Sequence, residues 1–250
     1  MSITNKCIIL DLDETCIHSF TYMDKLDKLN IMKDSKYLDI RRRIYKIKML
    51  DIDGDRDGSG KHAKMWGVER PYLKEFLTFC FSYFDIVAVW SAGVYKYVHE
   101  IVRHIFKDIG EPHIIFTRED CKVEKDGNLT KPISKMIEKV NEMNKFMNTM
   151  NTFIVDDRFD TFQYNYNNGI LIPPYNPKST IKGLREGDKA LLRFMTWLTE
   201  KNVHQSIDIR SLEKDRIFNL PASRINYDNL KHIEFPDNLH NYILKKENMN

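Results

Sequence analysis

Short apolar runs alternate along the chain with longer amphipathic stretches. The apolar runs cover residues 7–10, 84–89, 113–116, 153–155 and 169–172, and their length and polar boundaries predict buried strands. The amphipathic stretches predict helices over residues 71–81, 94–106, 132–144 and 187–200. Because strands that alternate with helices are typical of a parallel sheet with crossover helices, the pattern predicts an α/β fold with a mostly parallel sheet.

One segment departs from this alternation. Residues 43–50 and 61–68 flank the turn-rich stretch DIDGDRDGSG, which predicts a small β-hairpin inserted after the first strand, in an insertion of about residues 24–68. The periodicity fades beyond residue 202, and the chain ends in KKENMN. We therefore expect one domain over residues 1–202 and a C-terminal extension of unknown role over residues 203–250.

Composition narrows the class of protein. The 250 residues are 42% hydrophobic and 30% charged, which suits one substantial core. The net charge of +3 falls short of the concentrated positive charge expected of a nucleic-acid partner, so we expect no nucleic-acid binding. The basic residues Arg41, Arg42, Arg43, Lys46 and Lys48 suggest a localisation signal or a grip on a phosphorylated peptide, although a solvated hairpin face is the more common outcome.

Cysteine use and hydropathy point to the inside of a cell. Four cysteines lie far apart without a C-x-x-C pair, which argues against a zinc or redox motif and favours free thiols. No apolar stretch has the length to span a bilayer, and the N-terminus MSITNK lacks a secretory segment. We expect a soluble, intracellular monomer without membrane contact. Scarce Ala with abundant Asn, Lys and Ile indicates an AT-rich genome, such as that of a parasite or a large DNA virus.

The first predicted strand ends in two carboxylates, Asp11 and Asp13. In open α/β sheets ligands gather outside the carboxyl ends of the strands. Side chains two positions apart in extended chain face the same way, roughly 6 to 7 Å apart, so this pair can straddle a phosphoryl group. One carboxylate could attack phosphorus while the other serves as general acid and then general base. A solvated strand end is the alternative.

Two further positions carry weaker signals. Ser91 and Ala92 close the second apolar run before a predicted helix, where a hydroxyl and backbone N–H groups can hold an oxyanion, although such turns often contain Ser for other reasons. Lys131 precedes Pro132 at the start of a predicted helix, which fixes its place. A lone Lys is usually solvated, so neither position decides a function.

A second acidic pair, Asp156 and Asp157, follows the strand at residues 153–155. Two such pairs on neighbouring strands would repel each other strongly without a divalent cation. Because carboxylate oxygens are hard ligands, they suit Mg²⁺.

The order D-x-D-x-T, hydroxyl, Lys and D-D resembles the haloacid dehalogenase superfamily of phosphotransferases. It is similar, more narrowly, to its FCP-homology group, the RNA polymerase II C-terminal-domain phosphatases. The resemblance covers roughly residues 5–200 and implies a haloacid dehalogenase-like, Rossmann-type sheet flanked by helices. The stretches that carry it are LDLDET from Leu10, RP from Arg70, WSA from Trp90, FTREDC from Phe116, GNLTKPIS from Gly127 and VDD from Val155.

The resemblance also implies catalytic and metal-binding roles. Asp11 would be the nucleophile that becomes an aspartyl phosphate, and Asp13 would be the acid/base. Mg²⁺ would be held by Asp11, by the backbone carbonyl of Asp13 and by Asp157. Lys131 would balance charge around the phosphoaspartate, with Asp156 behind it.

Four residues would serve the substrate. Thr15 would steady the loop, Ser91 with Ala92 would hold the phosphoryl group, and Arg118 would help to position the phosphosite or the peptide. The chain departs from the group's pattern in several places: Cys16 stands where Leu is common, Ser91 stands where Thr is common, and residues 24–64 and the tail after residue 202 match only loosely.

These features predict a Mg²⁺-dependent protein serine/threonine phosphatase that acts on an extended phosphopeptide, with the polymerase tail as the implied substrate and the nucleus as the implied location. Only the hairpin covers the site, which favours a peptide over an enclosed metabolite. Two alternatives stay open: a small-molecule phosphatase of the same superfamily, and an inactive module that binds phosphopeptides. Retention of the full residue set argues against the inactive module.

Overall fold

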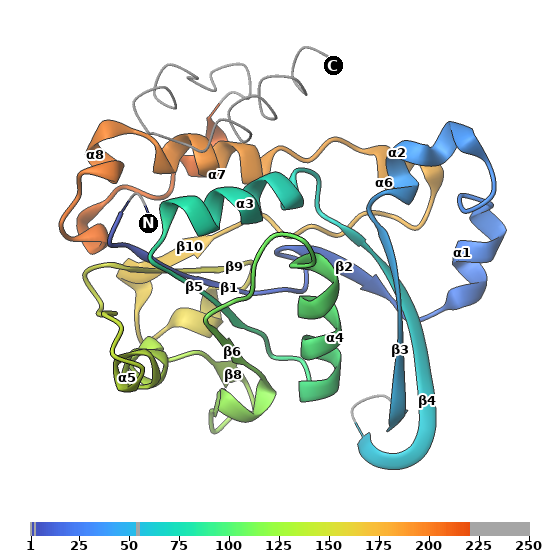
Figure 1. Ribbon diagram of the computed structural model, residues 1–250, viewed down its shortest axis with the longest axis horizontal. Helices are drawn as coiled ribbons and strands as arrows, with labels where there is room; N and C mark the ends of the chain where they lie inside the picture. Colours follow the sequence, from blue (N-terminus) through green and yellow to red (C-terminus); the bar gives the residue numbers. More distant parts are fainter. Residues whose placement is uncertain (1, 3, 54–55, 221–250) are drawn as a thin grey trace.

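The computed structural model describes residues 2, 4–53 and 56–220, and its centre is a five-stranded sheet in which every pairing is parallel (Figure 1). The chain of strand neighbours is β10-β9-β1-β5-β6, so β1 lies in the middle. This confirms the predicted α/β fold. The strands are β1 (Cys7–Leu10), β5 (Ile86–Trp90), β6 (Ile114–Phe116), β9 (Thr152–Asp156) and β10 (Gly169–Leu171).

Successive side chains along the strands point to opposite faces of the sheet and pack into two hydrophobic cores, one on each face. On β1, Ile8 and Leu10 belong to the larger core, and Cys7 and Ile9 belong to the smaller one. Figure 1 shows α3 and α7 on one side of the sheet and α5 on the other. The predicted helices are confirmed with ends that shift by a few residues: α3 (Leu73–Tyr83), α4 (Tyr95–Ile105), α5 (Ile133–Glu142) and α7 (Ala190–Leu198).

The predicted hairpin is present as β3 (Ile44–Asp53) and β4 (Arg56–Glu69), and it gains a third strand, β2 (Ile17–Phe20), on the other edge of β4. The sequence did not predict β2, because its four residues mix polar and apolar types without a clear period. The insertion also contains the short helices α1 (Met23–Leu29) and α2 (Leu38–Arg41). A third hydrophobic cluster, which includes Trp66, anchors these helices to β4.

The chain after α7 continues to contact the larger core. Ile209 and Ile217 are fully buried in it, so residues 203–220 pack against the parallel sheet's helical layer. The rest of the expected extension, residues 221–250, lies outside the described residues. Among the residues that are described, no helix combines the length and apolar character needed to cross a membrane. The other described α-helices and strands are α6 (Ile181–Arg185), α8 (Lys201–His204), β7 (Lys122–Val123) and β8 (Leu129–Thr130), and short 3-10 helices lie between the elements.

Arg43 does not lie on a solvated hairpin face, which is the more common outcome for such basic residues. Its guanidinium donates to the carbonyls of Glu69 (2.9 Å) and Leu184 and to the hydroxyl of Tyr175 (3.0 Å). Lys46 and Lys48, in contrast, are exposed. Arg43 therefore ties the hairpin to the chain around α6.

Arg70 is fully buried and ties the loop after β1 to two other segments. Its guanidinium donates to both carboxylate oxygens of Asp188 (3.0 and 2.8 Å), to the Thr15 carbonyl (3.0 Å) and to the Pro173 carbonyl (2.7 Å). Asp188 also accepts from the backbone N–H of Ala190 at the start of α7 (3.0 Å). A fully buried cation with this set of partners has a structural role.

We predict that Arg70→Leu lowers the free energy of unfolding by about 3–5 kcal/mol, because it leaves Asp188 and two carbonyls without their buried donor. The matched control is Arg185→Leu, which removes an exposed arginine that also pairs with an aspartate, Asp39 (2.8 Å). That change should have little effect, since water replaces the exposed partner. Urea unfolding of both variants measures the difference, and equal losses would contradict the role given to Arg70.

Candidate active site

The loop that follows β1 carries the first two candidate residues. The backbone N–H of Asp11 donates to the Val155 carbonyl (3.0 Å), so the pairing with β9 continues one residue past the strand. Leu12 is fully buried in the larger core. Alternation along extended chain then puts Asp11 and Asp13 on the side opposite to Leu12.

The chain reverses direction at Glu14, which has a left-handed backbone conformation (φ 57°). Hydrogen bonds to both of its peptide groups hold it there: its N–H donates to the Ile17 carbonyl (2.8 Å), and its carbonyl accepts from the Tyr175 N–H (2.7 Å). Such a conformation is unfavourable for a residue with a side chain, so these contacts offset its cost. Thr15 follows, fully buried, and its hydroxyl has no hydrogen-bond partner among the described residues.

Lys131 connects two carboxylates at the edge of the sheet. Its Nζ donates to Asp11 Oδ1 (2.6 Å) and to Asp156 Oδ2 (2.6 Å), and all three side chains are buried. The other oxygen of Asp156 accepts from the backbone N–H of Arg158 (2.9 Å). Burial alone would lower the pKa of Lys131, but the two carboxylates outweigh it and raise that pKa above its usual value. Lys131 is therefore a permanent cation.

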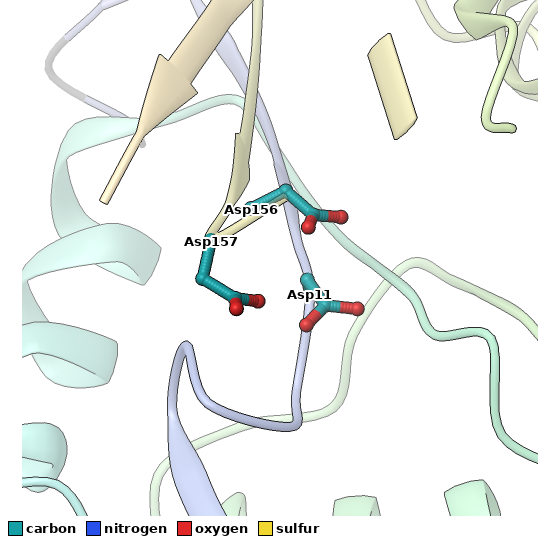
Figure 2. A group of neighbouring side chains, drawn as sticks. All are labelled: Asp11, Asp156 and Asp157. Carbon is teal, nitrogen blue, oxygen red and sulfur yellow. The ribbon is translucent and has the colours of Figure 1, made fainter. Parts of the chain in front are cut away.

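Figure 2 shows the carboxylates of Asp11, Asp156 and Asp157 gathered at the carboxyl ends of β1 and β9. One oxygen from each lies within 4.8 Å of the others. Burial, followed by the charges of Asp156 and Glu14, raises the pKa of Asp157 to about 6. Three carboxylates around one ammonium leave excess negative charge, and their hard oxygen atoms could hold a divalent cation such as Mg²⁺.

Asp13 lies apart from this cluster and accepts a hydrogen bond from the hydroxyl of Tyr97 on α4. Burial raises the pKa of Asp13 to about 6, while the hydrogen bond from Tyr97 opposes that rise. No sequence motif marks Tyr97, because a tyrosine on an amphipathic helix is usually a packing residue. Asp13 and Tyr97 border a cavity of about 550 Å³ between the hairpin sheet and α4, with Met49, Met65 and Val94 among its other lining residues.

Ser91, Ala92 and Arg118 form a second group at the end of β5, the neighbour of β1. Ser91 is buried, and its hydroxyl accepts from the N–H of Gly93 (3.0 Å). The guanidinium of Arg118 donates to the Ala92 carbonyl (2.9 Å), and the Arg118 N–H donates to the Gly93 carbonyl (2.9 Å). The structure thus joins Asp11, Lys131, Asp156 and Asp157 in one cluster and braces the Ser91 loop through Arg118.

The sequence matches a known protein family. The family model described as NLI interacting factor-like phosphatase matches residues 6–210. Two curated relatives are both named ubiquitin-like domain-containing CTD phosphatase 1. The Drosophila melanogaster protein is 27% identical over 211 residues, which is 80% of this chain and 62% of that protein. The Pongo abelii protein is 27% identical over 190 residues, which is 67% of this chain and 58% of that protein. The chain thus spans less than two thirds of either relative.

Two solved structures have a similar fold. One is the fission yeast RNA polymerase II CTD phosphatase Fcp1 bound to beryllium fluoride, with a TM-score of 0.54 and 18% identity over 86% of this chain and 61% of that one. The other is Fcp1, described as an essential RNA polymerase II CTD phosphatase, with a TM-score of 0.53 and 18% identity over 86% of this chain and 60% of that one. At this identity the likeness concerns the fold, and it confirms the predicted haloacid dehalogenase-like architecture.

Proposed function

The chain belongs to the NLI interacting factor-like phosphatase family, and from this premise we propose that it is a Mg²⁺-dependent protein serine/threonine phosphatase that works through an aspartyl phosphate on Asp11. Membership of the family confirms the resemblance to the FCP-homology group. One observation carries the proposal: the buried Lys131 bridge between Asp11 and Asp156, with Asp157 beside it. Burial raises the pKa of Asp11, and the Lys131 ammonium opposes that rise, so Lys131 favours the carboxylate form that a nucleophile needs.

In the first step Asp11 Oδ2 attacks phosphorus, while Oδ1 keeps its hydrogen bond to Lys131. The bond from phosphorus to the seryl or threonyl oxygen breaks, and Asp13 gives its proton to that leaving oxygen. In the second step the Asp13 carboxylate takes a proton from a water molecule that attacks phosphorus. Phosphate leaves, Asp11 is a carboxylate again and Asp13 is protonated again.

The donor set around the acidic cluster fits Mg²⁺. The carboxylates of Asp11 and Asp157 and the backbone carbonyl of Asp13 would hold it, since both oxygens of Asp156 already accept hydrogen bonds from Lys131 and Arg158. When bound, Mg²⁺ supplies positive charge next to the phosphoryl oxygens. Lys131 supplies a second positive charge, so the two cations together would balance the negative charges of the phosphoryl group and of the carboxylates.

The substrate is a phosphorylated protein segment. The cavity next to Asp13 is lined by apolar side chains of the hairpin and α4, which suits the residues that flank a phosphoserine or phosphothreonine in an extended peptide. Ser91 and Ala92 would bind phosphoryl oxygens, Thr15 would steady the loop, and Arg118 would hold the Ser91 loop or the peptide. Because the relatives are named as CTD phosphatases, the phosphorylated tail of RNA polymerase II is the proposed substrate and the nucleus the proposed location.

A substrate panel tests this proposal. We predict that the protein hydrolyses phosphoserine and phosphothreonine peptides with a higher kcat/KM than phosphosugars and nucleotides. Asp11→Asn should lose turnover, because an amide cannot form the acyl phosphate, while Asp126→Asn in an exposed turn should keep it. Phosphate release measures both variants. Faster hydrolysis of small molecules would favour the metabolite alternative, peptide binding without turnover would favour the inactive module, and an active Asp11→Asn would refute the covalent route.

A melting experiment tests the metal. We predict that millimolar Mg²⁺ raises the Tm of the protein relative to EDTA, because an ion that binds only the folded state stabilises it by mass action. Asp157→Ala removes one ligand together with part of the repulsion, so it should be at least as stable as the wild type in EDTA and gain little from Mg²⁺. The control Asp126→Ala should keep the full shift. An undiminished Tm shift in Asp157→Ala would show that Asp157 is not a metal ligand, and Asp156 would then be tested in its place.

A further inference from the structure

Three residues stand side by side across the hairpin sheet. Gly67 on the middle strand β4 pairs with Ser19 on β2 and with Tyr45 on β3. The Tyr45 side chain crosses over Gly67, and its hydroxyl lies 2.6 Å from the Ser19 hydroxyl. A Cβ atom at position 67 would lie 2.2 Å from the Tyr45 hydroxyl, which no real contact allows. Glycine at this position is thus what lets Tyr45 reach Ser19.

The contact continues to the candidate acid. The Ser19 hydroxyl also lies 2.6 Å from the Tyr97 hydroxyl, and Tyr97 donates to Asp13 Oδ1. Each hydroxyl has one proton to give. Since Tyr97 gives its proton to Asp13, Ser19 must donate to Tyr97, and Tyr45 must then donate to Ser19. Burial raises the pKa of Tyr45, so its phenol stays a donor. All three hydroxyls therefore point one way, from the hairpin sheet towards Asp13.

We propose that Tyr45, Ser19 and Tyr97 are positioning residues that orient Asp13 for proton transfer to the leaving oxygen. The inference rests on the proposed phosphatase function and extends it to residues outside the family motif. Through this chain of hydroxyls the sheet of β2, β3 and β4 takes part in the acid step, with Tyr45 coming from the insertion and Ser19 from the strand before it.

The chemical consequence concerns which oxygen of Asp13 holds the proton. Oδ1 accepts the hydrogen bond from Tyr97, so the acidic proton of Asp13 resides on Oδ2. As the bond between phosphorus and the seryl oxygen breaks, its electron pair stays on the seryl oxygen. That oxygen takes the Oδ2 proton, and Asp13 becomes a carboxylate that Tyr97 continues to stabilise. The hydroxyl chain thus holds the correct oxygen towards the leaving group.

A purely structural role would be the simpler explanation, because buried hydroxyls need hydrogen-bond partners in any fold. The two explanations differ in their dependence on the leaving group. An alkyl leaving group, as in phosphoserine, needs protonation as it departs, whereas p-nitrophenolate departs with little help. A defect in the orientation of Asp13 slows only the alkyl ester, while a general loss of structure slows both esters.

The test compares Tyr45→Phe with Tyr83→Phe. Tyr45 is two hydroxyls away from Asp13, so its variant alters no group that contacts the substrate. Tyr83 is the matched control, since it is also buried and its hydroxyl donates to the Leu198 carbonyl (2.6 Å) in the helical layer. We expect Tyr45→Phe to lower kcat for a phosphoserine peptide about two- to tenfold, as the loss of one hydrogen bond allows, with KM and p-nitrophenyl phosphate turnover unchanged. Tyr83→Phe should show no such selectivity.

A double variant makes the result specific. In an Asp13→Asn background, Tyr45→Phe should have no further effect on the phosphoserine peptide. Equal losses on both esters, or a Tyr45→Phe that matches Tyr83→Phe, would overturn the inference and leave the phosphatase proposal intact. Failure of the unaltered protein to hydrolyse either ester would refute the phosphatase proposal and this inference with it.

Discussion

The buried ammonium of Lys131 is the interaction on which the candidate site depends. The register that pairs Leu10 of β1 with Val155 of β9 brings the next residues, Asp11 and Asp156, side by side at the carboxyl edge of the sheet. Two carboxylates taken out of water at this distance are stable only with a cation between them. The chain supplies it from a distant segment, where the Lys131 N–H donates to the Thr161 carbonyl (2.6 Å) just before α5. Strand pairing thus places Asp11, the proposed nucleophile, and Lys131 offsets the cost of burying its carboxylate beside that of Asp156.

Two different parts of the fold hold the two carboxylates of the D-x-D motif. Asp11 is fixed by the parallel sheet, through the backbone pairing with β9 and through Lys131. Asp13 is held from the other side by Tyr97 on α4, and behind Tyr97 by the hairpin sheet. The sharp turn at Glu14 follows directly after Asp13, and the buried Arg70 holds that turn through the Thr15 carbonyl. The parallel sheet thus holds the proposed nucleophile, and α4 together with the sheet of β2, β3 and β4 holds the proposed acid.

The sequence predicts the features that depend on local pattern. The central strands are continuous apolar runs because both faces of the sheet are covered. Asp11, Ser91 and Asp156 are predicted to lie at one edge because parallel strands have their carboxyl ends on the same side. It does not predict the contacts between distant residues. Arg70 pairs with Asp188, 118 positions away, and Tyr97 with Asp13, 84 positions away. No local period encodes such pairs. Arg43 belongs to a basic stretch in the sequence, but in the structure it donates to the carbonyl of Glu69, a contact that a local pattern also cannot predict.

Phosphorylation of Asp11 is the central claim, and chemical trapping tests it most directly. The protein is mixed with Mg²⁺ and a phosphoserine peptide, quenched during turnover and treated with sodium borohydride, which reduces an aspartyl phosphate to homoserine. Mass spectrometry of the digested protein then locates the change. The account predicts homoserine in place of Asp11, only when substrate is present. Steady phosphate release with no reduced residue, or with the change at another carboxylate, would contradict it.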